Sequence, residues 1–453
     1  MTRNLSCFKA YDVRGKYPTE LNEKIAYRIG RAYAEFVNPK VVVVGRDIRL
    51  TSELLSQALI EGLIDCGVEV LDIGLCGSEQ VYFAAFYKQL DGGIMVTASH
   101  NPVDYNGFKF VRESSQPISS DTGLLEIKKR AELNKFDPIS IRGSVRSLDL
   151  SVQYISHLLG YLQPSKSLKS LKIVTNAGNG VAGHVIDLLE KHLPFEFIKI
   201  WHEPDGNFPN GVPNPHNHTG SESTSNAILS NNADLGIAWD GDFDRCCFFD
   251  HTGSYIDSYY IIGLLSSHLL KQHPGEKIVY EPRLTWNTID QTNKGGGTAV
   301  LCKTGHTFIK EKMRKINAIY GGEISAHHFF RSFGYCDSGM IPWLIICKMM
   351  IDQNKTLIQL VENQMTAFPS SGEISLSADH AVSIMLQVKQ HYQGKKHKLD
   401  ETEGISLEFE DWRFNLRTSQ TETFLRLNVE TRKNQTLLLQ KTNEVVKLVK
   451  SLQ

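Results

Sequence analysis

The apolar side chains in the first part of the chain alternate between two spacings. Between Ile25 and Phe36 they recur every three or four residues, which predicts a helix. The β-branched run Val41–Val44 then predicts a strand that is apolar on both faces. Leucines at four-residue intervals from Leu55 to Leu63 indicate a second helix, and Val68–Ile73 and Ile94–Thr97 indicate further strands. Short strands of this kind separated by helices are typical of a parallel sheet.

This alternation begins again near residue 171 and once more after a predicted turn at Asp250–Gly253. The predicted strands are Leu171–Thr175, Phe195–Trp201, Leu235–Trp239, Lys277–Tyr280 and Thr298–Leu301, and the predicted helices cover residues 181–192, 256–270 and 285–293. Three successive segments with the same alternation indicate three similar α/β domains with mixed sheets in series.

The last part of the chain has a different pattern. Pro369–Gly372 has the composition of a linker. The segments that follow predict helices at 378–392 and 435–452 and strands at 406–410 and 424–430, which together favour a small α+β domain. The predicted division is 1–148, 149–252 and 253–368 for the α/β domains and 369–453 for the α+β domain.

Composition narrows the functional classes. The chain of 453 residues carries 49 basic and 50 acidic side chains, and this balance argues against a broadly basic nucleic-acid binder or a polybasic membrane binder. Its hydrophobic fraction of 41% is enough for packed cores. The eight cysteines form no C-x-x-C pair, which disfavours a disulfide scaffold or a zinc site. No apolar leader is visible and Tyr259–Leu270 is too short to span a bilayer, so a reducing, cytoplasmic setting is expected.

Two loops after predicted strands carry candidate chemistry. Thr97–Pro102 presents Ser99 and His100 in a tight loop, although an ordinary turn explains the same residues equally well. Asp240, Asp242 and Asp244 follow the strand Leu235–Trp239 at alternate positions. Three adjacent carboxylates repel one another unless a cation lies among them, which favours a Mg²⁺ site over a solvated acidic turn.

Weaker candidates lie further along the chain and in one glycine loop. Gly321–His328 offers an acid, a hydroxyl and imidazoles suited to sugar hydroxyls, and Arg417–Glu422 offers an arginine and hydroxyls suited to a phosphate. A capped helix start and an exposed hairpin turn are the respective alternatives. Gly178–Gly183 matches G-x-G-x-x-G between a strand and a helix, which leaves a nicotinamide oxidoreductase as a minor alternative.

Taken in order, Tyr11–Gly15, Thr97–Pro102, Asp240–Arg245, Gly322–His327 and Arg417–Thr421 resemble the α-D-phosphohexomutase family. The resemblance covers nearly the whole chain. It implies four domains around one cleft, three of them alike, and transfer of a phosphoryl group between positions 1 and 6 of a hexose. Within the family it is closest to bacterial members that interconvert mannose 6-phosphate and mannose 1-phosphate for GDP-mannose synthesis. A glucose phosphate substrate, alone or in addition, is the alternative.

The resemblance also implies roles for individual residues. Ser99 would carry the phosphoryl group, a hexose 1,6-bisphosphate would be both intermediate and activator, and small sugar phosphates would be the ligands of a monomer or dimer. The implied residues are Ser99, Asp240, Asp242 and Asp244 for Mg²⁺; Arg14, Lys109 and Arg245 around the phosphoserine; Lys109, His100 and His306 as acid or base; Tyr11, Glu323, Ser325 and His327 for the sugar; and Arg417, Ser419, Gln420 and Thr421 for the second phosphate. Gln420 and Thr423 depart from the residues usual in the family's phosphate loop.

Overall fold

The computed structural model describes residues 4–136, 141–162, 170–214, 218–395, 397–418 and 424–453. The chain forms two compact units, one built from residues 1–255 and 326–357 and the other from residues 256–325 and 358–453. Among the described residues, no helix combines the length and the apolar character needed to cross a bilayer.

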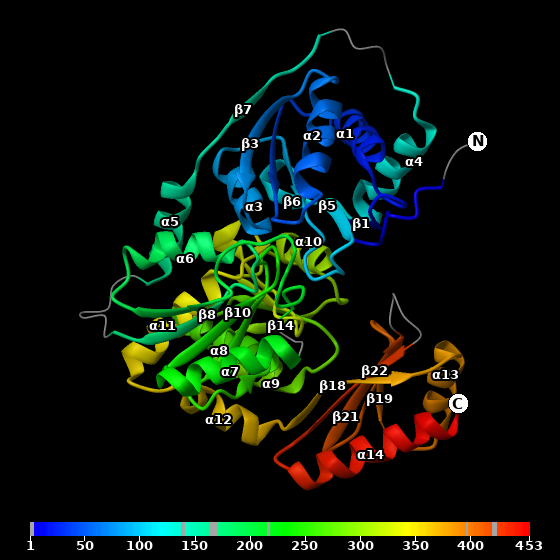
Figure 1. Cartoon of the computed structure of the whole chain (residues 1–453). Coiled ribbons are helices and arrows are strands. Elements are labelled where there is room, and N and C mark those ends of the chain that lie inside the picture. The colour runs from blue at the N-terminus through cyan, green and yellow to red at the C-terminus, as the bar shows by residue number, and fades with distance from the viewer. Residues whose placement is uncertain (1–3, 137–140, 163–169, 215–217, 396, 419–423) are drawn as a thin grey trace. The chain divides into compact units, whose positions relative to one another are not determined.

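The first unit begins with a mixed sheet whose strand order is β1-β5-β4-β2-β3-β7, with β6 beside β5 (Figure 1). β2, β3, β4 and β7 run parallel, whereas β5 is antiparallel to both β4 and β1. The elements are β1 (Val13–Lys16), α1 (Glu23–Val37), β2 (Val41–Arg46), α2 (Ser52–Ile64), β3 (Glu69–Leu75), α3 (Ser78–Tyr87), β4 (Gly92–Val96), β5 (Tyr105–Arg112), β6 (Gln116–Pro117), α4 (Leu125–Leu133) and β7 (Val145–Ser147).

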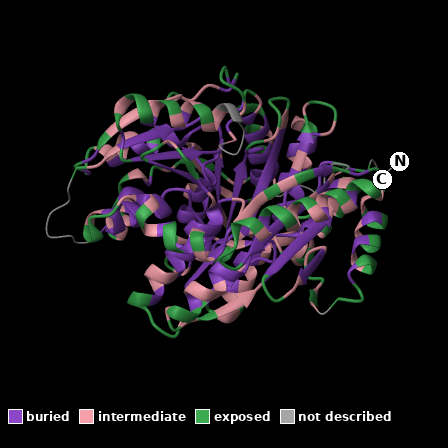
Figure 2. Ribbon diagram, turned by 90° about the horizontal axis from the view of Figure 1, so that it is seen from below, coloured by how far each residue is buried: buried purple, intermediate pink, exposed green. Residues whose placement is uncertain are grey.

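Sequence chemistry explains the first helix of this sheet. The side chain of Asn22 accepts a hydrogen bond from the backbone N–H of Ile25 and so caps α1, and Asn38 ends the helix in the left-handed region. The buried face of α1 joins a core with the interior side chains of β2 and β4, such as Val42 and Ile94. Figure 2 shows the result: central strands such as β4 are buried along their length, while the helices keep an exposed face.

A second sheet in the same unit has the order β11-β10-β8-β9. The segment 326–357 also belongs to this unit, and it contains the antiparallel pair β16-β17 and the helix α11. β8, β9 and β10 are parallel and β11 is antiparallel to β10. The elements are α5 (Ser151–Leu159), β8 (Lys172–Asn176), α6 (Ala182–Glu190), β9 (Glu196–Ile200), α7 (His218–Asn231), β10 (Leu235–Trp239), β11 (Cys246–Asp250), β16 (His328–Phe330), β17 (Cys336–Asp337) and α11 (Ile341–Gln353).

The second unit begins, after the short strand β12 (Tyr255–Ile256), with three parallel strands in the order β14-β13-β15. The helices predicted at 256–270 and 285–293 are close to their predicted limits, whereas the helices at His306–Ile316 and Leu357–Ala367 were not predicted. The elements are α8 (Ser258–Gln272), β13 (Lys277–Tyr280), α9 (Trp286–Lys294), β14 (Thr298–Leu301), α10 (His306–Ile316), β15 (Tyr320–Gly322) and α12 (Leu357–Ala367).

The rest of the second unit is an antiparallel sheet in the order β18-β22-β21-β20-β19. Figure 1 shows α14 running along it, and Val445 and Val449 join its core. The linker predicted at Pro369–Gly372 is wrong in part, because β18 already begins at Ser370 and bulges before Glu373. The elements are β18 (Ser370–Ser377), α13 (Ala381–His391), β19 (Lys398–Asp400), β20 (Ile405–Glu408), β21 (Trp412–Thr418), β22 (Phe424–Thr431) and α14 (Gln435–Ser451).

The α/β sheets repeat one arrangement, which confirms the predicted fold class of similar α/β domains followed by a smaller sheet domain. In each, the first of three successive parallel strands lies in the middle, with the second on one side and the third on the other: β3-β2-β4, β9-β8-β10 and β14-β13-β15. The third strands β4, β10 and β15 end directly before the candidate loops at Ser99, Asp240 and Glu323. The carboxyl end of a parallel strand beside a change in strand order is where α/β proteins bind ligands. The limits of the four predicted domains stay a prediction.

Candidate functional site

Ser99 lies in the loop between β4 and β5 with an unusual backbone conformation. Its φ is 50°, in the left-handed region that a non-glycine residue adopts only when its surroundings impose it. The hydroxyl of Thr97 accepts a hydrogen bond from the Ser99 N–H over 2.8 Å. The buried Ser99 Oγ donates to Asp240 Oδ2 over 2.6 Å and lies 3.1 Å from Arg245 Nη2. The structure therefore aims the serine hydroxyl at the acidic loop.

The acidic loop Asp240–Arg245 is the six-residue connection of a hairpin, because Trp239 of β10 pairs with Cys246 of β11. Phe243 turns the loop with a φ of 43° and is fully buried. The three aspartates are also fully buried, and one carboxylate oxygen from each lies within 4.8 Å of the others. Carboxylates this close together need compensating cations.

Basic side chains supply part of that compensation. Lys109 Nζ donates to Asp242 Oδ2 over 2.6 Å and also to Asp244 Oδ2, and Arg245 Nε lies 2.9 Å from Asp240 Oδ2. Burial would raise the pKa of Asp242, but Lys109 and Arg14 hold it well below its ordinary value. Burial would lower the pKa of Lys109, but Asp242 and Asp244 raise it above its ordinary value. Lys109 is therefore held as an ammonium ion in this arrangement.

Asp240 differs from its neighbours. Burial, together with the charges on Asp244 and Asp242, raises its pKa to about 6 against the opposing effect of Arg245. A carboxyl group in this environment gains most from a cation that replaces the missing positive charge.

The two oxygens of each aspartate are used differently. Every Oδ2 contacts a serine hydroxyl or a basic group, including the Ser78 hydroxyl, which donates to Asp242 Oδ2 over 2.5 Å. Every Oδ1 is buried and has no hydrogen-bond partner within the described part of the chain. Buried carboxylate oxygens without hydrogen-bond partners are costly, and three aspartates that each bring one oxygen within 4.8 Å of the others fit the oxygen ligands of a hard divalent cation. The residues present therefore fit a divalent metal.

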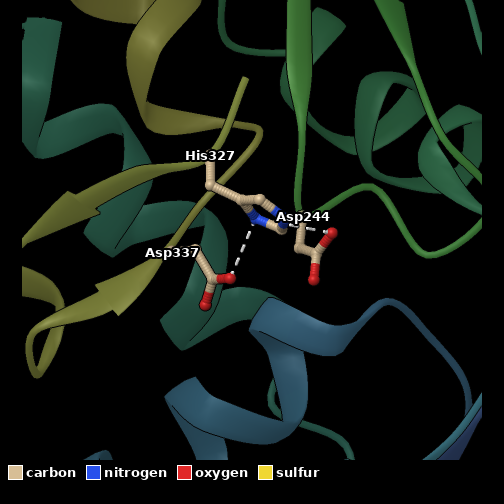
Figure 3. A group of neighbouring side chains, drawn as sticks. All are labelled: Asp244, His327 and Asp337. Carbon is tan, nitrogen blue, oxygen red and sulfur yellow. Dashed lines mark ion pairs between the residues drawn. The ribbon is translucent and has the colours of Figure 1, made fainter. Parts of the chain in front are cut away.

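His327 lies on the other side of Asp244. Its Nδ1 is 3.1 Å from Asp337 Oδ2 and 3.9 Å from Asp244 Oδ1, so the imidazole lies between the two carboxylates (Figure 3). Burial would lower the pKa of His327, but Asp244 and Asp337 raise it above its ordinary value. The positively charged form of His327 is thereby favoured next to the acidic loop.

Other predicted residues of the first unit surround the serine loop. Arg14 donates to Asp12 Oδ2 over 3.0 Å and to the Asn101 side chain over 2.8 Å. The Nδ1 of His100 contacts Arg245 Nη2 and lies 3.2 Å from Ser99 Oγ. The positive charge of Arg245, followed by burial, lowers the pKa of His100 well below its ordinary value. Tyr11 is half-buried two residues before β1.

In the second unit, Glu323 follows β15 directly, and its Oε1 accepts a hydrogen bond from the Gly305 N–H over 3.1 Å. Its Oε2 and the hydroxyl of Ser325 are buried atoms without a hydrogen-bond partner among the described residues. His306 is the first residue of α10, next to Gly305. An unpaired carboxylate oxygen and an unpaired hydroxyl are the groups that hydrogen-bond the hydroxyls of a sugar.

Arg417 lies in β21 within a cluster of charges. Its Nη1 donates to Asn428 Oδ1 over 2.9 Å, and its Nη2 pairs with the carboxylate of Glu373. Arg283 and Arg426 also pair with Glu373, at 3.7 and 3.4 Å. The three arginines lower the pKa of Glu373, although burial opposes them. One carboxylate facing three guanidinium groups indicates a place suited to an anion.

Sequence reasoning missed several of these residues. Arg283, Glu281 and Glu373 were not candidates, although Glu281 and Arg283 follow the predicted strand Lys277–Tyr280, as Asp240 follows its own strand. Their position after a parallel strand was a usable signal. Ser78 and Asp337 carry no such signal, because only the tertiary fold brings them to the site. The predicted residues Ser419, Gln420 and Thr421 lie outside the described residues.

The glycines of Gly178–Gly183 are explained by packing. A Cβ on Gly180 would lie 2.9 Å from the backbone oxygen of Gly241 in the acidic loop, and one on Gly183 would lie 2.3 Å from the oxygen of His202. The loop therefore needs small residues to fit against its neighbours, and the motif requires no dinucleotide to account for it.

The comparisons agree with this fold. Three family descriptions match the chain: "Phosphoglucomutase/phosphomannomutase, alpha/beta/alpha domain" I at residues 6–137, II at residues 152–253 and III at residues 257–368. The chain belongs to the phosphoglucomutase/phosphomannomutase family, and it is an enzyme of the phosphohexomutase type.

Individual proteins of known family are similar to this chain over nearly its whole length. The chain is 52% identical to a phosphomannomutase of Escherichia coli over 98% of its own length and 99% of the relative's. It is 53% identical to a phosphomannomutase of Vibrio cholerae, with 99% of each chain covered. A crystal structure of a phosphoglucomutase/phosphomannomutase family protein from Burkholderia thailandensis superimposes with a TM-score of 0.88 at 30% identity, covering 99% of this chain and 97% of that one.

Proposed function

We propose that this chain interconverts mannose 6-phosphate and mannose 1-phosphate. The observation that carries the proposal is the identity of 52–53% over almost the full length to phosphomannomutases of two bacteria. The product supplies GDP-mannose synthesis. Glucose phosphates are the second candidate, since the family name itself includes phosphoglucomutases.

We propose that Ser99 carries the phosphoryl group. In the first half-reaction the bond between Ser99 Oγ and phosphorus breaks while a sugar hydroxyl forms a new bond to phosphorus and loses its proton to a base. Ser99 Oγ takes up a proton, which yields a hexose 1,6-bisphosphate and a free serine hydroxyl. In the second half-reaction the bond between the other phosphate and its sugar oxygen breaks, Ser99 Oγ forms the new bond to phosphorus and loses its proton, and the sugar oxygen gains a proton. Because such transfers depend on positioning and charge neutralisation, the 2.6 Å contact of Ser99 Oγ with Asp240 supports the role.

We propose Mg²⁺ as the divalent metal and Asp240, Asp242 and Asp244 as its protein ligands, together with an oxygen of the phosphorylated Ser99. The three unpaired Oδ1 atoms support this assignment. The metal would supply positive charge for the transferring phosphoryl group. Arg245 and Arg14 add fixed positive charge around the serine loop, and a hexose 1,6-bisphosphate would prime the unphosphorylated enzyme.

We propose that the second unit binds the sugar phosphate. Glu323 and Ser325 would accept and donate hydrogen bonds to the sugar hydroxyls, and His327 and Tyr11 of the first unit would be further substrate contacts. Arg417, with Ser419, Gln420 and Thr421, would bind the phosphate that is not transferred. The pairing of Arg417 with Glu373 supports this role, because a guanidinium group that binds a carboxylate can bind a phosphate with the same donors. His100, Lys109 and His306 stay candidates for the proton transfer.

The proposal extends to the setting of the enzyme. We propose four domains with the limits 1–148, 149–252, 253–368 and 369–453, and a cytoplasmic location. The monomer and the dimer both remain open as the working form.

The test compares initial rates with mannose 1-phosphate and glucose 1-phosphate, in the presence of Mg²⁺ and a trace of hexose 1,6-bisphosphate. A strong preference for mannose 1-phosphate supports the proposal, whereas equal rates favour a dual enzyme. Ser99→Ala must abolish turnover without lowering the melting temperature. Turnover in that variant would remove Ser99 from the reaction, and Thr97→Ser provides a control in the same loop that keeps a hydroxyl at its own position.

A further inference from the structure

Arg49 is a buried arginine that the proposed chemistry leaves unused. It lies in the connection between β2 and α2, and its side chain is only 1% exposed. A guanidinium group buried to this extent needs several hydrogen-bond acceptors, because it carries a permanent charge and five N–H donors. The hydrogen-bond acceptors of Arg49 therefore indicate its role.

Four of those acceptors belong to one segment, the loop that carries Ser99. Arg49 Nη2 donates to the backbone oxygens of Ser99, over 2.8 Å, and Asn101. Arg49 Nη1 donates to the backbone oxygens of Pro102 and Tyr105 over 2.8 and 2.9 Å. One planar group therefore holds four carbonyl groups at fixed positions relative to one another.

Residues outside the serine loop also hold the guanidinium group of Arg49 in place. Asp47 Oδ2 lies 3.6 Å from Arg49 Nε, and Asp47 Oδ1 accepts hydrogen bonds from the Arg49 N–H and from the Ser52 hydroxyl. The ring of Phe208 lies on the guanidinium carbon at 5.5 Å from the ring centroid. Arg49 is thus held by the connection between β2 and α2 and by the segment after β9, independently of its contacts with the serine loop.

The contact bears directly on the strained conformation of Ser99. The left-handed backbone of this residue is held on both sides, since Thr97 Oγ1 accepts from its N–H and Arg49 donates to its C=O. With both peptide groups fixed, the Cα–Cβ bond can only point toward Asp240 and Arg245. A non-glycine residue keeps such a backbone only where its surroundings impose it.

We propose that Arg49 is a positioning residue for phosphoryl transfer: by binding four carbonyls of the serine loop it keeps Ser99 Oγ on the acidic loop. The proposal rests on the proposed role of Ser99. Arg49 does not touch Ser99 Oγ, so it acts through the backbone. Misplacing a reacting group by about 1 Å is enough to slow a reaction roughly 100-fold.

The variants are Arg49→Ala and Arg49→Lys, with Arg46→Ala as the matched control. Arg46 lies three residues earlier at the end of β2 and pairs with Glu53 and Asp72, away from the serine loop. For each variant the measurements are kcat, KM, the melting temperature, and the rate at which hexose 1,6-bisphosphate phosphorylates Ser99, followed by intact mass.

Arg49→Ala is expected to lower kcat and the rate of Ser99 phosphorylation by roughly 100-fold while KM changes less than about threefold. Guanidinium ion, added at millimolar concentrations that leave the wild type folded, is expected to restore at least one tenth of the lost rate in Arg49→Ala. It is expected to have no effect on Arg46→Ala. Arg49→Lys keeps the charge but not the planar set of donors, so it should resemble Arg49→Ala.

An Arg49→Ala protein that phosphorylates Ser99 at the wild-type rate would overturn the proposal. A loss of rate that guanidinium does not restore and that follows the loss of melting temperature would also overturn it, since the role would then be structural only. If Arg49→Ala does not fold, Arg49→Lys decides on the same criteria. Failure of the proposed function is seen separately, as a wild-type protein whose Ser99 takes up no phosphate from the bisphosphate.

Discussion

Proton and metal should compete for Asp240. Its pKa is raised to about 6, whereas Asp242 stays ionised far below that pH. A divalent cation at the three unpaired Oδ1 atoms must displace the proton of Asp240, so its apparent dissociation constant should rise tenfold for each pH unit below 6. At pH 5 the metal should bind roughly tenfold more weakly than on the plateau above pH 7, a difference of about 1 kcal/mol.

The same shift determines how the metal-free protein responds to pH. Because the folded pKa of Asp240 lies above its ordinary value of 3.8, the folded state binds the extra proton. Stability contributed by this carboxyl is therefore greatest below pH 3.8 and is lost as the pH rises through 6. The loss is about 3 kcal/mol. Saturating metal should reverse it, so the metal should raise the melting temperature more at pH 7 than at pH 5.

Calorimetric titration of Mg²⁺ at pH 5 to 8 tests this linkage. The background is Ser99→Ala, because a phosphoserine itself titrates near pH 6. Repeating the titration in buffers of different ionisation enthalpy counts the protons released, which should be close to one below pH 6 and close to none at pH 8. Asp240→Asn should bind more weakly and lose the pH dependence, while the surface control Asp290→Asn should behave as its parent. A Mg²⁺ affinity that does not change between pH 5 and pH 8 would refute the reasoning.

Three further predictions concern buried hydrogen bonds, a buried ion pair and the arginine proposed to bind phosphate. Glu79 accepts hydrogen bonds from Tyr154, Ser338 and two backbone N–H groups. In Glu79→Gln an amide NH₂ faces some of these donors, so the substitution should lower the free energy of unfolding by about 2–3 kcal/mol. An unchanged melting temperature would contradict this prediction. Arg413→Met leaves the fully buried Glu430 without its ion pair and should cost about 3–5 kcal/mol, most of which Arg413→Met with Glu430→Gln should recover. Arg417→Met should raise KM for the sugar phosphate roughly 10- to 100-fold with little change in melting temperature; an unchanged KM would remove Arg417 from phosphate binding.

Local signals in the sequence located most of the parallel strands of the α/β sheets. The strands Leu235–Trp239, Lys277–Tyr280 and Thr298–Leu301 have the predicted limits, because short runs of apolar residues between turns leave little choice of boundaries. α3 and α11 were missed, since both are apolar around most of their circumference and show no helical periodicity. β18 was missed because its first residues, Ser370–Gly372, have the composition of a turn and form a bulge.

The same distinction between local and long-range information applies to the residues of the site. The aspartates of the acidic loop could be chosen from their alternate spacing after a strand. Ser99 and Arg417 became candidates through the order of motifs that resembles the family, because a turn explains their immediate neighbours equally well. The sequence also determined the succession of α/β segments, since periodicity is a local property. Only the tertiary structure decided that Lys109 is paired with two carboxylates, that His327 lies between Asp244 and Asp337, and that Arg49 binds the serine loop. These contacts join residues far apart in the chain, and no local pattern of side chains encodes a distance of that kind.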